Sequence, residues 1–275
     1  MSKYPLFMSG LPGRMATTVA DAALESTDIE LQPFALTGAE EKVQKLDGLD
    51  VNLLHHNQSD EFLAKIKAQN SAIVVDYTHP DAVRKNVEFY TAHQIPFVLG
   101  TTGGDYSEIE QLVIDTKTPA VIAPNMALPI VAITSMLTQA REDYPGVFDG
   151  YELNVRESHQ KGKADTSGTA KALISEWQGM GASFSEEENL KLCRDPEEQK
   201  SNWGISDEYL TGHAYHTYDL NSEDKTAHFS LSHNILGRKI YALGTLHALR
   251  FLSKRLDDPV TKSYNMIDVL RNLRK

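Results

Sequence analysis

Residues 157–172 read ESHQKGKADTSGTAKA, a polar stretch with one histidine and three lysines that leads into a Ser-Gly-Thr turn. Lys163 follows His159 by four residues, and a helix start begins at Ser167. A proton donor beside a cation and an anion-binding turn is what the reduction of a carboxylated double bond requires. The other interpretation that the residues allow is a solvated polar loop ending in a helix cap, whose trimming the fold would survive.

A second candidate site lies near the N-terminus, where SGLPGRMATTVADAAL follows an apolar run. Gly10, Gly13 and Ala16 have the spacing G-x-x-G-x-x-A and lead into a helix rich in alanine and valine. Glycines allow a tight turn and close approach of a pyrophosphate, and the helix N-terminus favours anions. The pattern predicts a dinucleotide-binding turn, the alternative being an ordinary turn from strand to helix.

The end of the next strand bears on the choice of dinucleotide. A protein selective for NAD usually places an acidic residue there against the ribose hydroxyls, but this chain has Leu36, Thr37 and Gly38. A 2′-phosphate therefore becomes acceptable, and Arg14 is close enough in sequence to contact it. We expect NADPH as the cofactor, with NADH possible, and we expect Thr37→Asp to favour NADH.

Two further loops follow apolar strands at their carboxyl ends, GTTGG at 100–104 and APNMALP at 123–129. Ligands of open parallel sheets bind at that edge. Both loops are therefore predicted to contact the cofactor, although Gly and Pro are also common in turns without any ligand.

The 275 residues favour two domains, and their composition limits the partners. A formal charge of −11 disfavours binding to nucleic acid or to acidic membrane surfaces. No apolar run is long enough for a membrane span or a signal peptide, so we expect a cytoplasmic protein. The single cysteine, Cys193, excludes an internal disulfide and is poorly placed for catalysis.

The histidines do not predict a metal site. His55 with His56, and His213 with His216, lack a third ligand at a recognisable spacing. His216 alternates with apolar neighbours, which indicates a half-buried strand residue.

The elements that must position these residues follow from the apolar pattern. Short apolar runs at 6–8, 51–54, 72–77, 97–100 and 120–123 alternate with helical patterns, which predicts an α/β fold with a Rossmann-type, doubly wound parallel sheet. A second, mixed α+β domain follows: a helix near 129–142, a strand ending in YELNVRESH, a helix from about Thr169 to Trp177, and strand-like HAYHTYDL and AHFSLSHN that predict an antiparallel sheet. The domains are placed at 1–127, completed by 240–275, and at 128–239. Whether the acidic segment 184–205 is ordered is not predicted.

These motifs, in their order along nearly the whole chain, resemble a known family. GLPGRM, VVDYTHP, GTTGGD, APNMAL, ESHQKGKADTSGTAKA and SHNILGRKIYALGT together resemble the 4-hydroxy-tetrahydrodipicolinate reductases, which belong to the diaminopimelate route to lysine. The segment E-S-H-x3-K-x-D-x-S-G-T is highly specific, and its form here is similar to the plant-type branch.

The resemblance implies a role for each matching residue. His159 and Lys163 are then the catalytic pair, and substrate contacts fall on Gln160, Ser167, Gly168, Thr169 and Arg238. Together with Thr37, the implied dinucleotide contacts are Gly10, Leu11, Pro12, Gly13, Arg14, Met15, Gly100, Thr101, Thr102, Pro124, Asn125, Met126 and Ala127. No metal is implied. The chain departs from the common bacterial form at Gln160, where a second histidine is usual, and at Ala16, which occupies the third glycine position.

The activity that the resemblance implies is the NAD(P)H-dependent reduction of 4-hydroxy-tetrahydrodipicolinate, a small dicarboxylate. Residues 128–239 would bind this substrate and form a homo-oligomer, a tetramer or alternatively a dimer. Two alternatives remain: another two-domain NAD(P) oxidoreductase, and a non-catalytic dinucleotide sensor. The sensor has no reason to keep His159, Lys163 and the Ser-Gly-Thr turn together.

Overall fold

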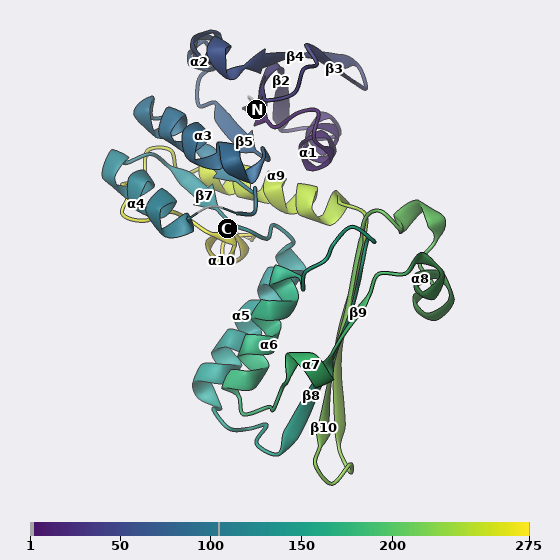
Figure 1. Ribbon diagram of the computed structural model, residues 1–275. Coiled ribbons are helices and arrows are strands. Elements are labelled where there is room, and N and C mark those ends of the chain that lie inside the picture. Colours follow the sequence, from purple (N-terminus) through teal and green to yellow (C-terminus); the bar gives the residue numbers. More distant parts are fainter. Residues whose placement is uncertain (1–2, 104, 275) are drawn as a thin grey trace. The chain divides into compact units, whose positions relative to one another are not determined.

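Two groups of strands organise the chain in the computed structural model, which describes residues 3–103 and 105–274 (Figure 1). Contacts divide the chain into one unit formed by Met1–Val131 with Lys239–Lys275, and a second formed by Ala132–Arg238. The second unit is therefore inserted into the sequence of the first. No helix of the described residues is long and apolar enough to cross a membrane.

The first unit contains a sheet with the strand order β3-β4-β2-β1-β5-β6-β7. Its strands are β1 Tyr4–Ser9, β2 Ile29–Thr37, β3 Val43–Leu46, β4 Leu49–His55, β5 Ile73–Asp76, β6 Phe97–Leu99 and β7 Ala120–Ile122. Every neighbouring pair from β4 to β7 is parallel, and the order reverses direction at β1. The predicted doubly wound sheet is confirmed.

One strand of this sheet departs from the prediction. β3 pairs antiparallel with β4 at the edge of the sheet. Its sequence VQKL carries two polar residues and its side chains are exposed or half-buried, so it lacks the apolar run on which the other strands were predicted.

Helices cover both faces of the first sheet because its strands bury side chains on both sides. These helices are α1 Arg14–Leu24, α2 Ser59–Lys67, α3 Pro80–Ala92, α4 Tyr106–Thr116, α9 Lys239–Ser253 and α10 Met266–Leu270, with a 3-10 turn at His56–Gln58. Along β1, Met8 belongs to the apolar cluster shared with α1 and α9, whereas Phe7 belongs to the cluster shared with α2, α3 and α4.

The C-terminal segment belongs to this unit. α9 contacts α1 and the strands β5, β6 and β7. Beyond it, Tyr264 forms a bridge to the edge strand β7: its amide donates to Ala120, and its carbonyl accepts from Ile122.

The second unit is built on a sheet with the order β11-β10-β8-β9. Its strands are β8 Tyr151–His159, β9 Leu190–Cys193, β10 His213–Ser222 and β11 His228–Leu236. β10 is antiparallel to both β8 and β11, whereas β9 is parallel to β8. The expected antiparallel sheet is therefore mixed.

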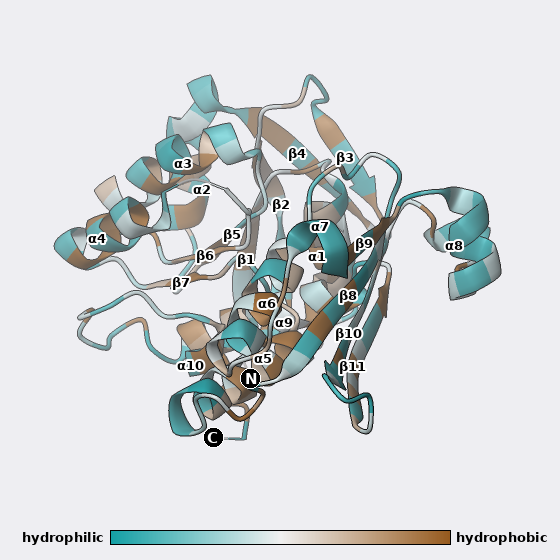
Figure 2. Ribbon diagram, turned by 60° about the horizontal axis from the view of Figure 1, so that its bottom comes forward, coloured by the Kyte–Doolittle hydropathy of each residue, from teal (hydrophilic) through white to brown (hydrophobic). Residues whose placement is uncertain are grey.

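Helices of this unit are α5 Leu128–Asp143, which begins in the first unit, α6 Gly168–Gly179, α7 Glu186–Asn189 and α8 Pro196–Trp203, with a 3-10 turn at Asp207–Tyr209. The acidic segment 184–205 is ordered into α7, β9 and α8. Figure 2 shows α8 as largely hydrophilic, in accordance with its sequence PEEQKSNW.

One face of the second sheet changes character along β8. Leu153 and Val155 lie in an apolar cluster with Leu173 and Trp177 of α6. Further along the same face, Glu157 and His159 are buried instead. The strand thereby brings polar side chains to the beginning of α6.

Candidate active site

The first unit has a pocket of about 600 Å³ at the carboxyl ends of β1, β2 and β5. It is lined by residues 10–13, 36–39 and 77–80, together with Glu41, His56 and Ala82. The pocket therefore contains the predicted Gly10, Leu11, Pro12, Gly13 and Thr37. A helix N-terminus that opens into such a pocket suits the pyrophosphate of a dinucleotide.

Contacts within the protein already require glycine at both Gly10 and Gly13, without any bound ligand. Gly10 has φ +107°, and a Cβ there would lie 2.6 Å from the carbonyl carbon of Tyr77. At Gly13 a Cβ would lie 2.7 Å from the carbonyl oxygen of Gly10. The tight turn is thus as predicted, and it packs against the loop after β5.

The end of β2 differs from the sequence interpretation in two ways. Thr37 is buried, its hydroxyl donates to the Leu11 carbonyl at 2.6 Å, and the same oxygen accepts from the Ala39 amide. An aspartate could not make the first bond, so Thr37 is a poor position for testing the cofactor. Moreover, the exposed Glu41 lines the pocket, so a carboxylate follows this strand after all.

The other predicted cofactor residues lie outside the lining of this pocket, as far as the described residues show: Arg14, Met15, Gly100, Thr101, Thr102, Pro124, Asn125, Met126 and Ala127. Gly104 of the GTTGG loop lies outside the described residues. Thr101 is buried, and its hydroxyl lies 3.3 Å from the Asp76 carboxylate and 3.2 Å from the Thr78 carbonyl.

The 123–129 loop is also held from within. The Asn125 side chain accepts from the Ala127 amide at 2.9 Å, and both Met126 and Ala127 are buried. Gly244 of α9 leaves room for the Met126 backbone, which a Cβ would meet.

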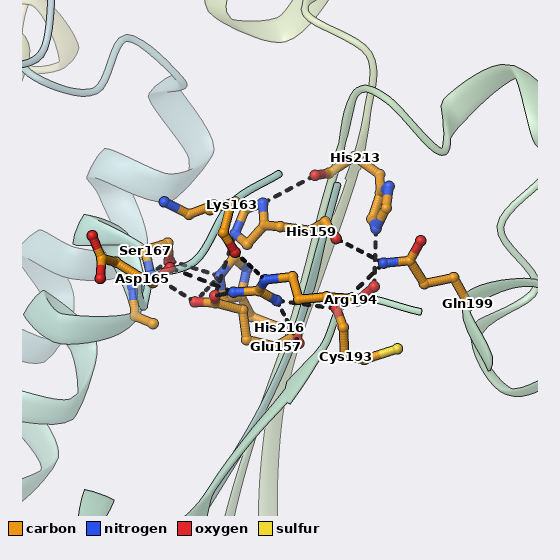
Figure 3. A network of polar contacts seen from close by, with 12 residues as sticks. Glu157, His159, Lys163, Asp165, Ser167, Cys193, Arg194, Gln199, His213 and His216 are labelled. Atoms are coloured by element: carbon orange, nitrogen blue, oxygen red, sulfur yellow. Dashed lines mark hydrogen bonds and ion pairs between the residues drawn. The ribbon is translucent and has the colours of Figure 1, made fainter. Parts of the chain in front are cut away.

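In the second unit, His159 is the last residue of β8 and is buried (Figure 3). Its Nδ1 lies 3.1 Å from the His213 carbonyl, and its own carbonyl accepts from Gln199 at 2.7 Å. A carbonyl only accepts, so the proton of the neutral ring is on Nδ1. Nε2 has no hydrogen-bond partner among the described residues.

The pKa of His159 is lowered to about 4, mainly by burial and then by the nearby His216, Arg194 and Lys163, while Glu157 acts in the opposite direction. His159 is therefore neutral at pH 7, with an unprotonated Nε2. The sequence placed His159 at the end of this strand, as the structure has it, but took it as a proton donor in polar surroundings. The structure shows instead a buried ring that must first gain a proton.

Lys163 lies in the loop between β8 and α6, where its amide donates to the Gln160 carbonyl at 3.0 Å. Arg194 holds the same loop: its Nε donates to the Lys163 carbonyl at 2.6 Å. In Figure 3 the Lys163 ammonium nitrogen takes part in none of the contacts drawn.

Ser167 caps α6, as its position before Gly168 and Thr169 predicts. Its hydroxyl accepts from the Ala170 amide at 3.0 Å and lies 2.9 Å from His216 Nε2. A Cβ at Gly168 would meet nothing within 4 Å, so the first turn of α6 is open at that residue. Such a turn attracts a carboxylate through its amides and the helix dipole.

Glu157 connects these parts and was not singled out from the sequence. Its Oε2 accepts from the Ser167 amide at 2.9 Å and lies 3.2 Å from His216 Nε2, and its Oε1 pairs with Arg194. Burial raises the pKa of Glu157, but the bonds from His216, Ser167 and Arg194 outweigh burial and hold it well below its ordinary value.

His216 is also more than the half-buried strand residue expected. It is 1% exposed and lies opposite Glu157 on β8 and opposite His233 on β11. Glu157, His159 and His216 place possible metal ligands within 4.8 Å of one another. However, Arg194 already neutralises the carboxylate, so this donor set suits an ion pair better than a metal ion.

The two remaining predicted substrate residues lie near the same end of the sheet. Gln160 follows His159 directly. Arg238 follows β11, next to Gly237, whose amide donates to Gly212 at 2.7 Å. Because His159 pairs with Ala214 and Ala214 with Ile235, Arg238 belongs to the edge where β8 ends.

Comparison with known proteins identifies the chain. The family described as "Dihydrodipicolinate reductase, N-terminus" matches residues 5–126, and its C-terminal counterpart matches residues 131–270. The chain belongs to the dihydrodipicolinate reductase family. The predicted resemblance is confirmed, and this family is one of oxidoreductases.

Plant proteins are among the relatives of this chain, which confirms its similarity to the plant-type branch. An Oryza sativa subsp. japonica protein named "Probable 4-hydroxy-tetrahydrodipicolinate reductase 1, chloroplastic" is 42% identical over 98% of this chain and 79% of its own length. The chloroplastic 4-hydroxy-tetrahydrodipicolinate reductase 1 of Arabidopsis thaliana is 39% identical over 97% of this chain and 77% of its own.

Among solved structures, the dipicolinate-bound dihydrodipicolinate reductase from Paenisporosarcina sp. TG-14 matches with a TM-score of 0.64. The match covers 97% of this chain and 98% of that one, at 15% identity. It confirms the fold of this reductase.

Proposed function

We propose that this reductase catalyses the reduction of 4-hydroxy-tetrahydrodipicolinate to tetrahydrodipicolinate with a nicotinamide dinucleotide. The hydroxyl group leaves as water, and a hydride and a proton are taken up, so that atoms and charge balance. When bound, the reduced dinucleotide supplies the hydride. The observation that carries the proposal is Nε2 of His159, which has no hydrogen-bond partner in the described part of the chain and belongs to the same polar cluster as the first turn of α6.

The residues of the second unit bind and orient the dicarboxylate. The first turn of α6, at Ser167, Gly168 and Thr169, receives one carboxylate, and Lys163 and Arg238 supply positive charge for the other. Helix N-termini and charge-assisted hydrogen bonds favour such groups. Gln160 contacts the substrate beside His159.

Substrate binding also prepares the proton. Two carboxylates brought near His159 raise its pKa, because an opposite charge favours the protonated ring. His159 then holds a proton on Nε2 and delivers it to the substrate. Orientation and charge stabilisation account for most of the rate.

The pocket at β1, β2 and β5 fits the phosphate-bearing part of the dinucleotide, because residues 10–13 present the N-terminus of α1 to it. The choice between the two dinucleotides depends on opposed charges. Arg14 favours a 2′-phosphate and Glu41 disfavours it, so we propose that NADPH and NADH are both used.

The test is cofactor oxidation with 4-hydroxy-tetrahydrodipicolinate formed in situ by the synthase that makes this compound. Steady oxidation of either dinucleotide supports the proposal. Binding of the dinucleotide without oxidation would support a sensor, and oxidation only with a sugar or a semialdehyde would support another oxidoreductase.

Assembly and compartment stay predictions. A homo-oligomer formed through residues 128–239 is supported by β11, an edge strand with Phe229 and Leu236 exposed. Light scattering distinguishes a tetramer from a dimer. The cytoplasmic location is tested by fractionation, which matters because the plant relatives carry the word chloroplastic in their names.

A further inference from the structure

Arg194 joins the segment after β9 to the loop that carries Lys163. Besides the 2.6 Å bond to the Lys163 carbonyl, it donates to the Glu157 carbonyl at 3.2 Å and to the Asp165 carbonyl at 3.4 Å. Its side chain is 16% exposed. A guanidinium has five donors in a fixed fork, and here they hold four backbone carbonyls, the fourth being that of Cys193 at 3.0 Å, and the carboxylate of Glu157.

Glu157 divides its carboxylate between the two remaining parts of the site. One oxygen holds the Ser167 amide, immediately before α6. The other, Oε1, lies 3.9 Å from Nε2 of His159. Glu157 thus brings a negative charge to this ring. The other ionisable groups that act on the ring are His216, His233, Arg194 and Lys163.

We propose that Glu157 and Arg194 form a positioning pair with divided roles: Arg194 fixes the Lys163 loop for substrate binding, and Glu157 stabilises the proton on His159. The inference rests on the proposed function, which it extends to two residues that contact neither substrate nor cofactor. A buried ion pair adds little net stability, since desolvation offsets its attraction. We therefore expect the ion pair to matter more for the positions of the Lys163 loop and His159 than for the stability of the fold.

The role of Arg194 is tested with Arg194→Lys. Lysine keeps the positive charge beside Glu157 but cannot reach all four carbonyls. We expect KM for the substrate to rise about 10-fold, while the pH at which kcat falls stays unchanged. Arg156→Lys is the matched control, because Arg156 lies on β8 in an exposed ion pair with Asp219. It should change neither value.

The role of Glu157 is tested with Glu157→Gln. The amide oxygen can still accept from Ser167, but no negative charge faces His159. The pKa of His159 then falls, so the descending limb of kcat should move about one unit to lower pH, with kcat at pH 7 about 10-fold lower and KM changed less. Glu152→Gln on the same strand is the control, since Glu152 is exposed and contacts Asn154 and Asn189.

Folding of each variant is checked by its Tm, and Glu157→Asp serves if Glu157→Gln does not fold. Aspartate keeps the charge on a shorter side chain, so KM should rise with the pH limb unchanged. Loss of Tm with equal effects on KM and kcat and no movement of the limb would overturn the proposal. Wild-type protein that does not turn over would instead contradict the proposed function, because these comparisons require an active parent enzyme.

Discussion

Two hydrogen bonds hold His159 and leave only one of its ring nitrogens for chemistry. Its carbonyl and Nδ1 are occupied by Gln199 and His213, and burial keeps the ring neutral. Nε2 alone is available. A ring that is fixed in this way can act on a substrate without first reorganising, which is what preorganised catalysis requires.

Replacement of His159 should therefore be made with a side chain of similar volume. His159→Gln is expected to lower kcat about 100-fold, the usual scale for a general acid, while alanine would also leave a cavity. The measurement is steady-state cofactor oxidation together with Tm. His228→Gln is the control, since His228 is an exposed histidine on β11. Near-normal kcat in His159→Gln would remove this residue from the mechanism.

Lys163 tests the other member of the catalytic pair. Lys163→Ala should lower kcat about 100-fold by removing the positive charge near the substrate, and the fold should be retained because this side chain is only half-buried. Exposed Lys161→Ala, in the same loop, should remain active. Equal activity of the two variants in a single-turnover assay would contradict the assignment.

The dinucleotide preference should respond to the charge at Glu41. Glu41→Gln is expected to raise kcat/KM for NADPH relative to NADH about 3- to 10-fold, because a carboxylate near a 2′-phosphate is repulsive. Glu40→Gln removes the same charge from an exposed neighbour outside the pocket lining and should change the ratio less. An unchanged ratio in both variants would place the 2′-phosphate elsewhere.

Site residues could be predicted from the sequence where they lie close together in one local motif. The spacing of His159, Lys163 and Ser167 is visible within one loop, and the helix cap was found from it. Arg194 could not be found, since it reaches the site only because β9 pairs with β8, in an acidic segment without an apolar pattern. Glu157 meets His216 through strand register, which a linear sequence does not display.

At the level of elements, the first turn of α6 is the part that discriminates between ligands. Because a Cβ at Gly168 would meet nothing within 4 Å, Gly168→Ala and then Gly168→Val should leave Tm nearly unchanged and weaken the binding of pyridine-2,6-dicarboxylate progressively. A monocarboxylate should bind wild type about 10- to 150-fold more weakly. Inhibition constants measure both effects. Loss of NADPH binding with the dicarboxylate retained would assign the turn to the cofactor.

Strands could be predicted from the sequence where both of their faces are buried. β5, β6 and β7 are continuous apolar runs because helices cover both faces of their sheet. β3 and β9 were missed because they are four residues long, lie at sheet edges and carry polar side chains. For such strands the pairing partner decides the structure more than local propensity does.

At the level of the whole molecule, stability should depend on two buried histidines. Burial lowers the pKa of both His159 and His233 from 6.5 to about 4. As pH falls from about 6.5 to 4, the unfolded chain binds protons that the folded chain does not, so stability is lost in that window. The slope should be on the order of 1 to 2 kcal/mol per pH unit for the two together.

Urea unfolding at pH 7 and pH 5 measures this loss, with fluorescence of Trp177 and Trp203, both in the second unit. His233→Gln should reduce the slope by about half, and exposed His228→Gln should leave it unchanged. Equal stability at the two pH values would show that burial does not lower the pKa of these two histidines in the folded protein.

The insertion of the second unit into the first has a consequence for synthesis on the ribosome. Residues 132–238 emerge as one uninterrupted stretch, whereas β5, β6 and β7 must wait for α9. At about 5 to 20 residues per second, that interval is roughly 6 to 24 seconds. During it, Val75, Val98 and Val121 lack their α9 neighbours Leu246 and Leu249. The nascent dinucleotide unit thus presents an uncovered apolar face to chaperones until α9 has been synthesised.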